Sequence, residues 1–158
     1  MKKLIVAMIR PRLEYASVVW SPHKKKHINK IERIQRAATK LVPGLRDLSY
    51  QERLQRLNLP TLEDRRERGD LITVYKALKG MGKVDREDLF IWDTRETRGH
   101  GGKLKKMNCR RDVKNYSFPH RTVNAWNSLD KDNVLAKAIH DFKYQLDCKR
   151  YGDRTPRA

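Results

Sequence analysis

Apolar residues recur along most of this chain at the spacing of amphipathic α-helices. The clearest stripe runs through residues 24–42 with a period of about 3.6, which is the period of an α-helix. Its apolar members are Ile28, Ile31, Ile34, Ala38, Leu41 and Val42. Cationic side chains repeat on the opposite side with the same period, at Lys26, Lys30, Arg33, Arg36 and Lys40. This pattern predicts a helix with one buried face and one cationic face, which Pro43-Gly44 ends.

The most apolar stretch, PRLEYASVVWSP, lies near the start of the chain at residues 11–22. Its spacing is typical of a core-forming helix. The candidate core or docking residues in it are Leu13, Tyr15, Val18, Val19 and Trp20. Residues 2–10 and 11–20 are expected to form one kinked helix or two, because proline is tolerated best in a first helical turn.

Residues 49–80 carry clear signals for two further helices. Ser49 with Glu52 three positions later predicts a capping box for a short helix, which Asn58-Leu59-Pro60 ends. Thr61 is expected to cap a longer helix with carboxylates in its first turn, where they complement the helix dipole. Gly80 suits the position directly after the end of that helix.

The second half of the chain changes character at residues 90–107. β-forming residues flank a glycine-rich centre, which predicts either a short β-hairpin or an ordered loop. Two helices are expected afterwards, over 117–129 and 136–150. The buried side of the second contains Ala138, Ile139, Phe142 and Leu146, with Tyr144 as a further candidate.

The expected fold is therefore mainly α: a small basic helical domain over residues 1–150. Its N-terminal helices occupy residues 1–80, and its basic loop and C-terminal helices occupy residues 90–150. Residues 151–158 are expected to be a frayed tail, because chain ends without anchoring contacts are seldom ordered.

Charge narrows the choice of partner. The 158 residues include 37 Lys and Arg against 19 Asp and Glu, a formal net charge of +18, and such a field favours nucleic acid or anionic lipid. A membrane is not expected as a partner. The sequence has no lipidation signal, no amphipathic helix with exposed aromatic side chains and no stretch long enough to span a bilayer. The apolar start MKKLIVAMI is short and lacks a small-residue cleavage site. We therefore expect an intracellular protein, nuclear and/or cytoplasmic and not secreted.

Catalytic motifs do not emerge from the sequence. There is no Asp-Asp pair and no nucleotide-binding, hydrolase or zinc-protease motif, and Cys109 and Cys148 lie far apart. We expect no enzyme activity and no cofactor. An enzyme whose metal site assembles from scattered carboxylates and His23, His27 or His100 stays open as an alternative.

Two segments concentrate the positive charge. Residues 21–46 hold eight Lys and Arg against Glu32 alone, and residues 95–121 hold nine against Glu96 and Asp112. Two such runs favour contacts to the phosphates of RNA and/or DNA. Besides the cationic face of residues 24–42, the candidate binding residues are Arg95, Arg98, His100, Lys103, Lys105, Lys106, Arg110, Arg111 and Lys114.

The order of motifs resembles a known family. The segments are RPRLEYASVVWSP, IERIQRAATKLVPGL, LSYQERLQRLNLPTLEDRRERGDLITVYKAL, TRGHGGKLKK, FPHRTVNAWNSL and FKYQLD. Together they are similar to the C-terminal region of reverse transcriptases encoded by non-LTR (LINE, jockey-like) retrotransposons, over roughly residues 4–147. The resemblance implies thumb and connecting helices that follow the polymerase palm and hold the RNA template and the primer.

The same resemblance implies what this chain would lack. The family's aromatic-x-Asp-Asp turn in the palm and the zinc knuckle of some relatives have no counterpart in the sequence, which reads as a truncated or predicted-gene remnant. The expected function is a non-catalytic, nucleic-acid-binding fragment that contacts template and primer backbones, with the remainder of a reverse transcriptase as a further partner. Two alternatives stay open: a protein-interaction module that docks through residues 11–22, and a non-functional genomic remnant.

Overall fold

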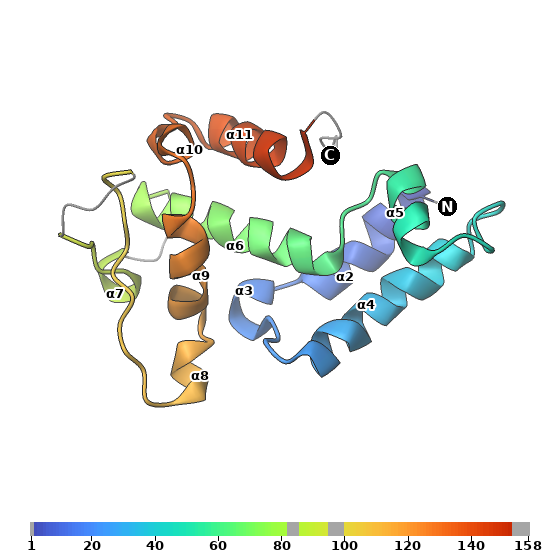
Figure 1. The fold of residues 1–158 in the computed structure, drawn as a ribbon, viewed down its shortest axis with the longest axis horizontal. Coiled ribbons are helices and arrows are strands. Elements are labelled where there is room, and N and C mark those ends of the chain that lie inside the picture. Colours follow the sequence, from blue (N-terminus) through green and yellow to red (C-terminus); the bar gives the residue numbers. More distant parts are fainter. Residues whose placement is uncertain (1, 82–85, 95–99, 153–158) are drawn as a thin grey trace. The chain divides into compact units, whose positions relative to one another are not determined.

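The structure is a computed structural model that describes residues 2–81, 86–94 and 100–152 (Figure 1). It confirms the mainly helical fold, with 66% helix and no β-strand in the described residues. Contacts divide the chain into two compact units whose boundary, after Arg66, falls within helix α6 (Leu62–Leu78). The two units are described separately.

The first unit opens with an almost continuous helical segment: α1 (Lys2–Leu4), a π-helix (Ile5–Ile9) and α2 (Arg10–Glu14). The wider π turn, in which the Arg10 N–H reaches back to the Ile5 carbonyl, immediately precedes Pro11. Proline therefore lies inside the helical segment without ending it. The break comes later, at Ala16, whose left-handed φ of 50° separates α2 from α3 (Ser17–Trp20).

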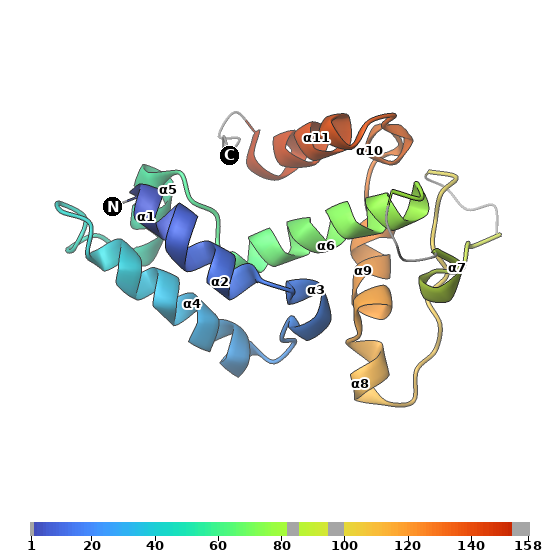
Figure 2. The same ribbon diagram turned by 180° about the vertical axis from the view of Figure 1, so that it is seen from behind.

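Helix α4 (Lys25–Lys40) lies against the π-helix, and α5 (Tyr50–Leu57) packs on α4 (Figures 1 and 2). A small apolar core holds these elements together. It consists of Ile5, Ala38, Leu45, Leu54, Leu57 and Leu59, with Ile9, Val42, Leu48 and Tyr50 packed around it.

The buried face of α4 differs from the expected stripe. Of the six predicted residues only Ala38 is buried, whereas Ile34 and Leu41 are 46% and 69% exposed. The other buried residues of α4 are polar: Glu32, Gln35 and Thr39. The physical reason is that this face meets polar partners from α2 and α5, which the periodicity of α4 alone does not reveal.

The predicted helix ends are confirmed. The Glu52 N–H donates to the Ser49 hydroxyl (3.3 Å), and the Ser49 N–H donates to the Glu52 carboxylate (2.8 Å), which together form the capping box. Asn58 ends α5 in the left-handed region, at φ 48°. Thr61 accepts the Asp64 N–H at 3.1 Å, as an N-cap residue does.

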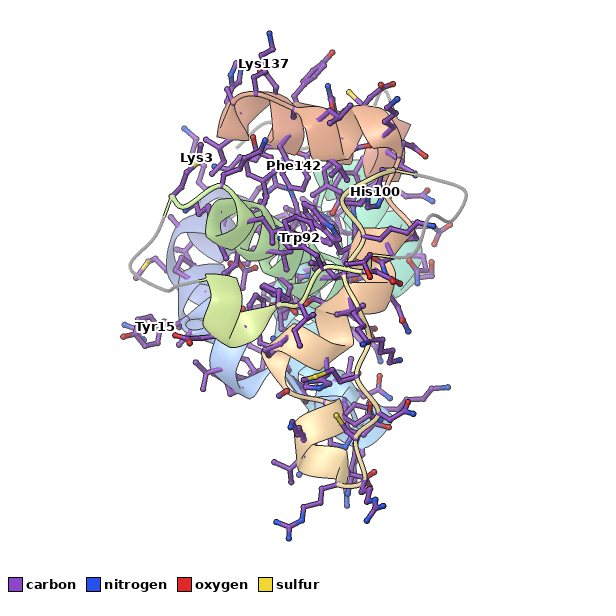
Figure 3. All side chains as sticks on the ribbon, turned by 90° about the vertical axis from the view of Figure 1, so that its left-hand side faces the viewer. Lys3, Tyr15, Trp92, His100, Lys137 and Phe142 are labelled. Carbon is purple, nitrogen blue, oxygen red and sulfur yellow. The ribbon has the colours of Figure 1, made fainter. Side chains whose placement is uncertain are left out.

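The second unit contains the rest of α6 together with α7 (Arg86–Leu89), α8 (Asp112–Asn115), α9 (Phe118–Asn127), α10 (Lys131–Leu135) and α11 (Ile139–Tyr151). Its core is aromatic. Tyr75 stacks on Phe142 with ring centroids 4.4 Å apart, and Trp126 lies 6.0 Å from Phe142. Figure 3 shows Phe142 beneath α11, on the side that faces α6. These contacts pack α6, α9 and α11 together.

Residues 90–94 and 100–107, the described parts of the expected hairpin or loop, show minimal β-pairing. Among these residues there is one isolated antiparallel bridge, between Trp92 and Leu104, while 95–99 lie outside the described residues. Helix α9 holds the segment in place. The Asn127 side chain accepts from the Leu104 N–H and donates to the Leu104 carbonyl, both at 2.8 Å, and the Trp126 indole donates to the Gly102 carbonyl at 2.9 Å.

Two predictions concern the long helices of the second unit: where α6 ends, and which residues of α11 are buried. Gly80, at φ 66°, ends α6 as predicted, with the Met81 N–H bonded to the Lys76 carbonyl at 2.8 Å. In α11, Phe142 and Leu146 are buried as predicted, but Tyr144 and the N-cap residue Ala138 are exposed. Of the expected frayed tail, residues 153–158 lie outside the described residues.

No helix in the described part of the chain has the length and apolar character needed to cross a bilayer.

Candidate nucleic-acid interface

Helix α4 presents a cationic face in the first unit. All five predicted residues on it, Lys26, Lys30, Arg33, Arg36 and Lys40, are exposed. At 1.5 Å per residue, the 14 steps from the first to the last span about 21 Å. Because the residues recur three or four positions apart, they form a continuous strip along one side of the helix.

The acidic residue within this basic segment faces inward. Glu32 is only 7% exposed, and one carboxylate oxygen accepts from the Leu62 N–H at 3.0 Å. The other oxygen accepts the Tyr50 hydroxyl. In the sequence, Glu32 is the one acidic residue among the eight cations of residues 21–46. In the structure, its carboxylate is not part of the exposed surface of α4. The exposed strip therefore carries no compensating acid of its own.

A buried polar network fixes the orientation of α4. Gln35 accepts from the Arg10 guanidinium at 2.8 Å, and its amide donates to the Tyr50 hydroxyl and to the Pro60 carbonyl, both at 3.1 Å. Arg10 also donates to the Pro60 carbonyl at 2.7 Å. Since these bonds join α2, α4, α5 and the connection between α5 and α6, they determine which side of α4 faces solvent.

Burial shifts the ionisation of this network. It lowers the pKa of Arg10 to about 10, helped by the nearby charge of Arg65 and opposed by Glu14. It raises the pKa of Tyr50, and the hydrogen bond to Glu32 raises it further. Tyr50 is therefore a neutral hydroxyl donor at ordinary pH.

Tyr50 also places one residue of the cationic strip. The Arg36 guanidinium lies 4.9 Å from the centroid of the Tyr50 ring, which is within range of a cation–π contact. Arg53 approaches the same ring at 5.6 Å and donates to the Thr39 hydroxyl at 3.1 Å. The strip therefore contains one cation held by an aromatic ring, and Arg36 keeps its exposure.

The second basic segment lies in the second unit. Its exposed predicted cations are Lys105, Lys106, Arg110, Arg111 and Lys114. Lys103 is half-buried and engaged in a further interaction. Arg95 and Arg98 lie outside the described residues. The exposed Asp112, in the first turn of α8, stands among the cations, so this surface is less purely basic than the α4 strip.

Two members of this segment have structural roles. His100, predicted as a surface contact, is only 3% exposed, and its Nε2 lies 3.3 Å from the Trp126 carbonyl. That prediction is wrong because His100 packs edge-on against Trp126. Arg121 donates twice to the Asp70 carboxylate, at 2.8 and 3.0 Å, and so ties α9 to α6.

The apolar N-terminal candidates are mostly outside the core. Tyr15 and Val19 are 79% and 83% exposed, and Trp20 is 41% exposed, while Leu13 and Val18 are half-buried. Figure 3 shows Tyr15 projecting away from the ribbon. A core role is therefore wrong for Tyr15, Val19 and Trp20. The turn at Ala16 interrupts the single helical stripe on which that prediction depended.

A buried histidine was not anticipated from the sequence. His120, in the first turns of α9, is 8% exposed and lines a small pocket, and its Nε2 has no hydrogen-bond partner. Burial lowers the pKa of this imidazole, and the charges of Lys114 and Lys106 lower it further. The local sequence FPHRTVNAW gives no signal for this, since most of the pocket's other lining residues, at positions 89–91, 105 and 107, come from outside α9.

The described residues contain no group of three or more His, Cys, Asp or Glu side chains placed to hold a metal ion. His23 and His27 are both exposed, near the start of α4. Cys109 and Cys148 are free thiols.

Comparison with known proteins adds no relative. No protein-family model matches the chain, and neither the curated proteins nor the solved structures include a significant match.

Proposed function

We propose that this chain is a non-catalytic nucleic-acid-binding module of the type found in the C-terminal region of non-LTR retrotransposon reverse transcriptases. It contacts the sugar-phosphate backbone of template and primer through α4 and the basic segment 103–114. The observation that carries this proposal is the exposed strip of α4, whose own carboxylate, Glu32, is turned inward.

The length of the strip suits a polyanion. Phosphates on one strand of a duplex recur every 3.4 Å or so along the axis, so about 21 Å of helix lies alongside about six of them. Five cations that each meet a phosphate give a slope of log K against log salt of about −4.5 on duplex DNA. Such contacts fix position without reading sequence.

The test compares two sets of neutral substitutions. In the first, Lys26, Lys30, Arg33 and Lys40 become Gln, while Arg36 is kept because it contacts Tyr50. The matched control replaces four exposed cations from elsewhere, Lys3, Arg12, Arg56 and Lys137, and so removes the same charge. Salt-titrated binding is measured on an RNA–DNA hybrid, single-stranded RNA and duplex DNA, after circular dichroism confirms that each variant is folded.

We expect the α4 variant to lose about 0.9 from the salt slope on duplex DNA for each phosphate contact removed, and the control to keep the wild-type slope. A preference for the hybrid over both other nucleic acids would support a template-primer clamp. Equal slopes for the two variants would contradict a role for α4, and absence of salt-dependent binding in the wild-type protein would contradict the proposal altogether.

A second candidate function uses the exposed apolar residues Tyr15, Val19 and Trp20. Exposed apolar patches are common at sites of protein association. On this alternative the chain docks onto a protein partner, with the remainder of a reverse transcriptase as the candidate. The Val19→Asp variant would then lose binding to a purified non-LTR reverse transcriptase that lacks this region, while keeping wild-type affinity for nucleic acid.

A further inference from the structure

A small pocket adjoins the basic segment of the second unit. Its walls are apolar except for Lys105 and His120, and are formed by Leu89, Phe90, Ile91, Met107, Pro119 and Val123. The cavity volume is ≈ 20 Å³, which holds a water molecule or a hydroxyl group. A nucleobase is several times larger and does not fit. Ile91, Lys105 and Met107 are exposed and connect the pocket with solvent.

The hydrogen bonds around His120 define its tautomer. The Ser117 hydroxyl donates its single proton to the Lys114 carbonyl at 2.7 Å. With that proton donated to the carbonyl, Nδ1 of His120, 3.1 Å from the same hydroxyl oxygen, is assigned as the donor in that contact. In the neutral ring Nε2 then carries a lone pair, and this buried acceptor has no partner.

An unpaired buried acceptor is costly unless a donor reaches it. The surroundings indicate which kind of donor. Lys105 lines the pocket, and the ammonium groups of Lys106 and Lys114 are close enough to act on the His120 ring. A ligand that suits both features carries an O–H group next to an anionic group. In nucleic acids the ribose 2′-hydroxyl, adjacent to the 3′-phosphate, has this arrangement, and deoxyribose lacks it.

We propose that this pocket receives a ribose 2′-hydroxyl of an RNA strand, which donates its proton to Nε2 of His120. The flanking phosphates lie against Lys105, Lys106 and Lys114, and the exposed Ile91 and Met107 at the opening of the pocket pack on the carbon atoms of the sugar. This inference rests on the proposed nucleic-acid binding and deepens it, because it makes RNA the preferred strand at the second unit. Binding is the whole of the proposal; no bond is made or broken.

The test varies the sugar and the histidine independently. Three single strands of one sequence are compared: RNA, DNA and 2′-fluoro RNA, which keeps the RNA-like sugar but has no hydroxyl donor. Each is titrated against the wild-type protein, His120→Phe, which keeps a ring without an acceptor, and His120→Gln, which keeps an acceptor oxygen. The salt slope is recorded in every case.

We expect the wild-type protein to bind RNA about fivefold more tightly than 2′-fluoro RNA, as for one hydrogen bond to a buried acceptor. His120→Phe should bind both strands equally, His120→Gln should keep part of the preference, and the salt slope should stay constant. If His120→Phe does not fold, the wild-type sugar series and His120→Gln still decide the question.

Equal affinity of the wild-type protein for RNA and 2′-fluoro RNA, with a steep salt slope, would overturn this inference and leave the proposed function standing. So would a preference that survives in His120→Phe, or one that follows base sequence and ignores the sugar. Absence of binding to every strand would instead overturn the proposed function, and this inference with it.

Discussion

Glu32 in α4 accepts the backbone N–H of Leu62, the first residue of α6, at 3.0 Å. A carboxylate at a helix N-terminus satisfies an unpaired N–H and interacts favourably with the helix dipole. The same side chain accepts the Tyr50 hydroxyl from α5. One buried carboxylate thus joins three helices of the first unit and leaves the opposite side of α4 to its cations.

Replacing this carboxylate should destabilise the first unit. In Glu32→Ala, the Leu62 N–H and the Tyr50 hydroxyl both lose their acceptor in a buried site, so we expect a loss of about 2–4 kcal/mol in the free energy of unfolding. Glu32→Gln keeps one acceptor oxygen and should lose less. Urea denaturation followed by circular dichroism measures both variants, and an unchanged stability of Glu32→Ala would show that the network contributes little.

Stability should depend on pH through His120. Its pKa is lowered in the folded protein, chiefly by burial. Below the unfolded value of about 6.5, the unfolded chain therefore binds a proton that the native state resists. The contribution of His120 is present above that pH and is lost as the pH falls through the folded pKa. Melting temperatures of the wild-type protein and His120→Gln between pH 8 and 5 test this: the wild-type curve should fall more steeply on acidification, and parallel curves would contradict it.

Asn127 should control the order of the segment around Leu104. Its side-chain amide pairs with both backbone groups of that residue, at 2.8 Å each. Asn127→Ala removes both bonds, and we expect a loss of about 1–3 kcal/mol. Amide hydrogen exchange would show faster exchange at Leu104 and Lys105, whereas unchanged protection would mean that core packing alone holds the segment. Asn127→Asp, which keeps the acceptor and loses the donor, serves as the intermediate case.

Two neighbouring glycines should respond differently to alanine. A Cβ atom at Gly102 would lie 3.1 Å from Cγ1 of Val134, while at Gly101 it would meet nothing within 4 Å. We expect Gly102→Ala to destabilise the second unit by about 1–3 kcal/mol, since the surrounding side chains must shift. Gly101→Ala is the matched control and should stay close to the wild-type stability. Equal melting temperatures for the two variants would argue against tight packing at Gly102.

Local signals were the part of the fold that the sequence predicted well. The capping box at Ser49, the cap at Thr61 and the end of α6 at Gly80 depend on residues a few positions apart, and all three are confirmed. The cationic side of α4 was also predicted correctly as exposed, because charged side chains seldom lie buried without partners.

Long-range packing accounts for the rest. The buried face of α4 is polar because Gln35 pairs with Arg10 and Tyr50, which lie 25 and 15 positions away in the sequence. The opposite errors at His100, buried instead of exposed, and at Val19, exposed instead of buried, have the same origin. Hydropathy patterns report what a segment could bury, and the partners that decide it come from elsewhere in the chain.

The three tryptophans of the chain differ in environment. Trp126 is 1% exposed and its indole N–H is bonded to the Gly102 carbonyl, while Trp20 and Trp92 are 41% and 40% exposed. Their fluorescence should therefore separate into a blue-shifted, quencher-resistant component from the core of the second unit and a red-shifted component accessible to iodide. In a titration with a non-fluorescent nucleic acid, a change in the red-shifted component would report binding near Trp20 or Trp92. The blue-shifted component from Trp126 would show in the same sample whether the core of the second unit has stayed intact.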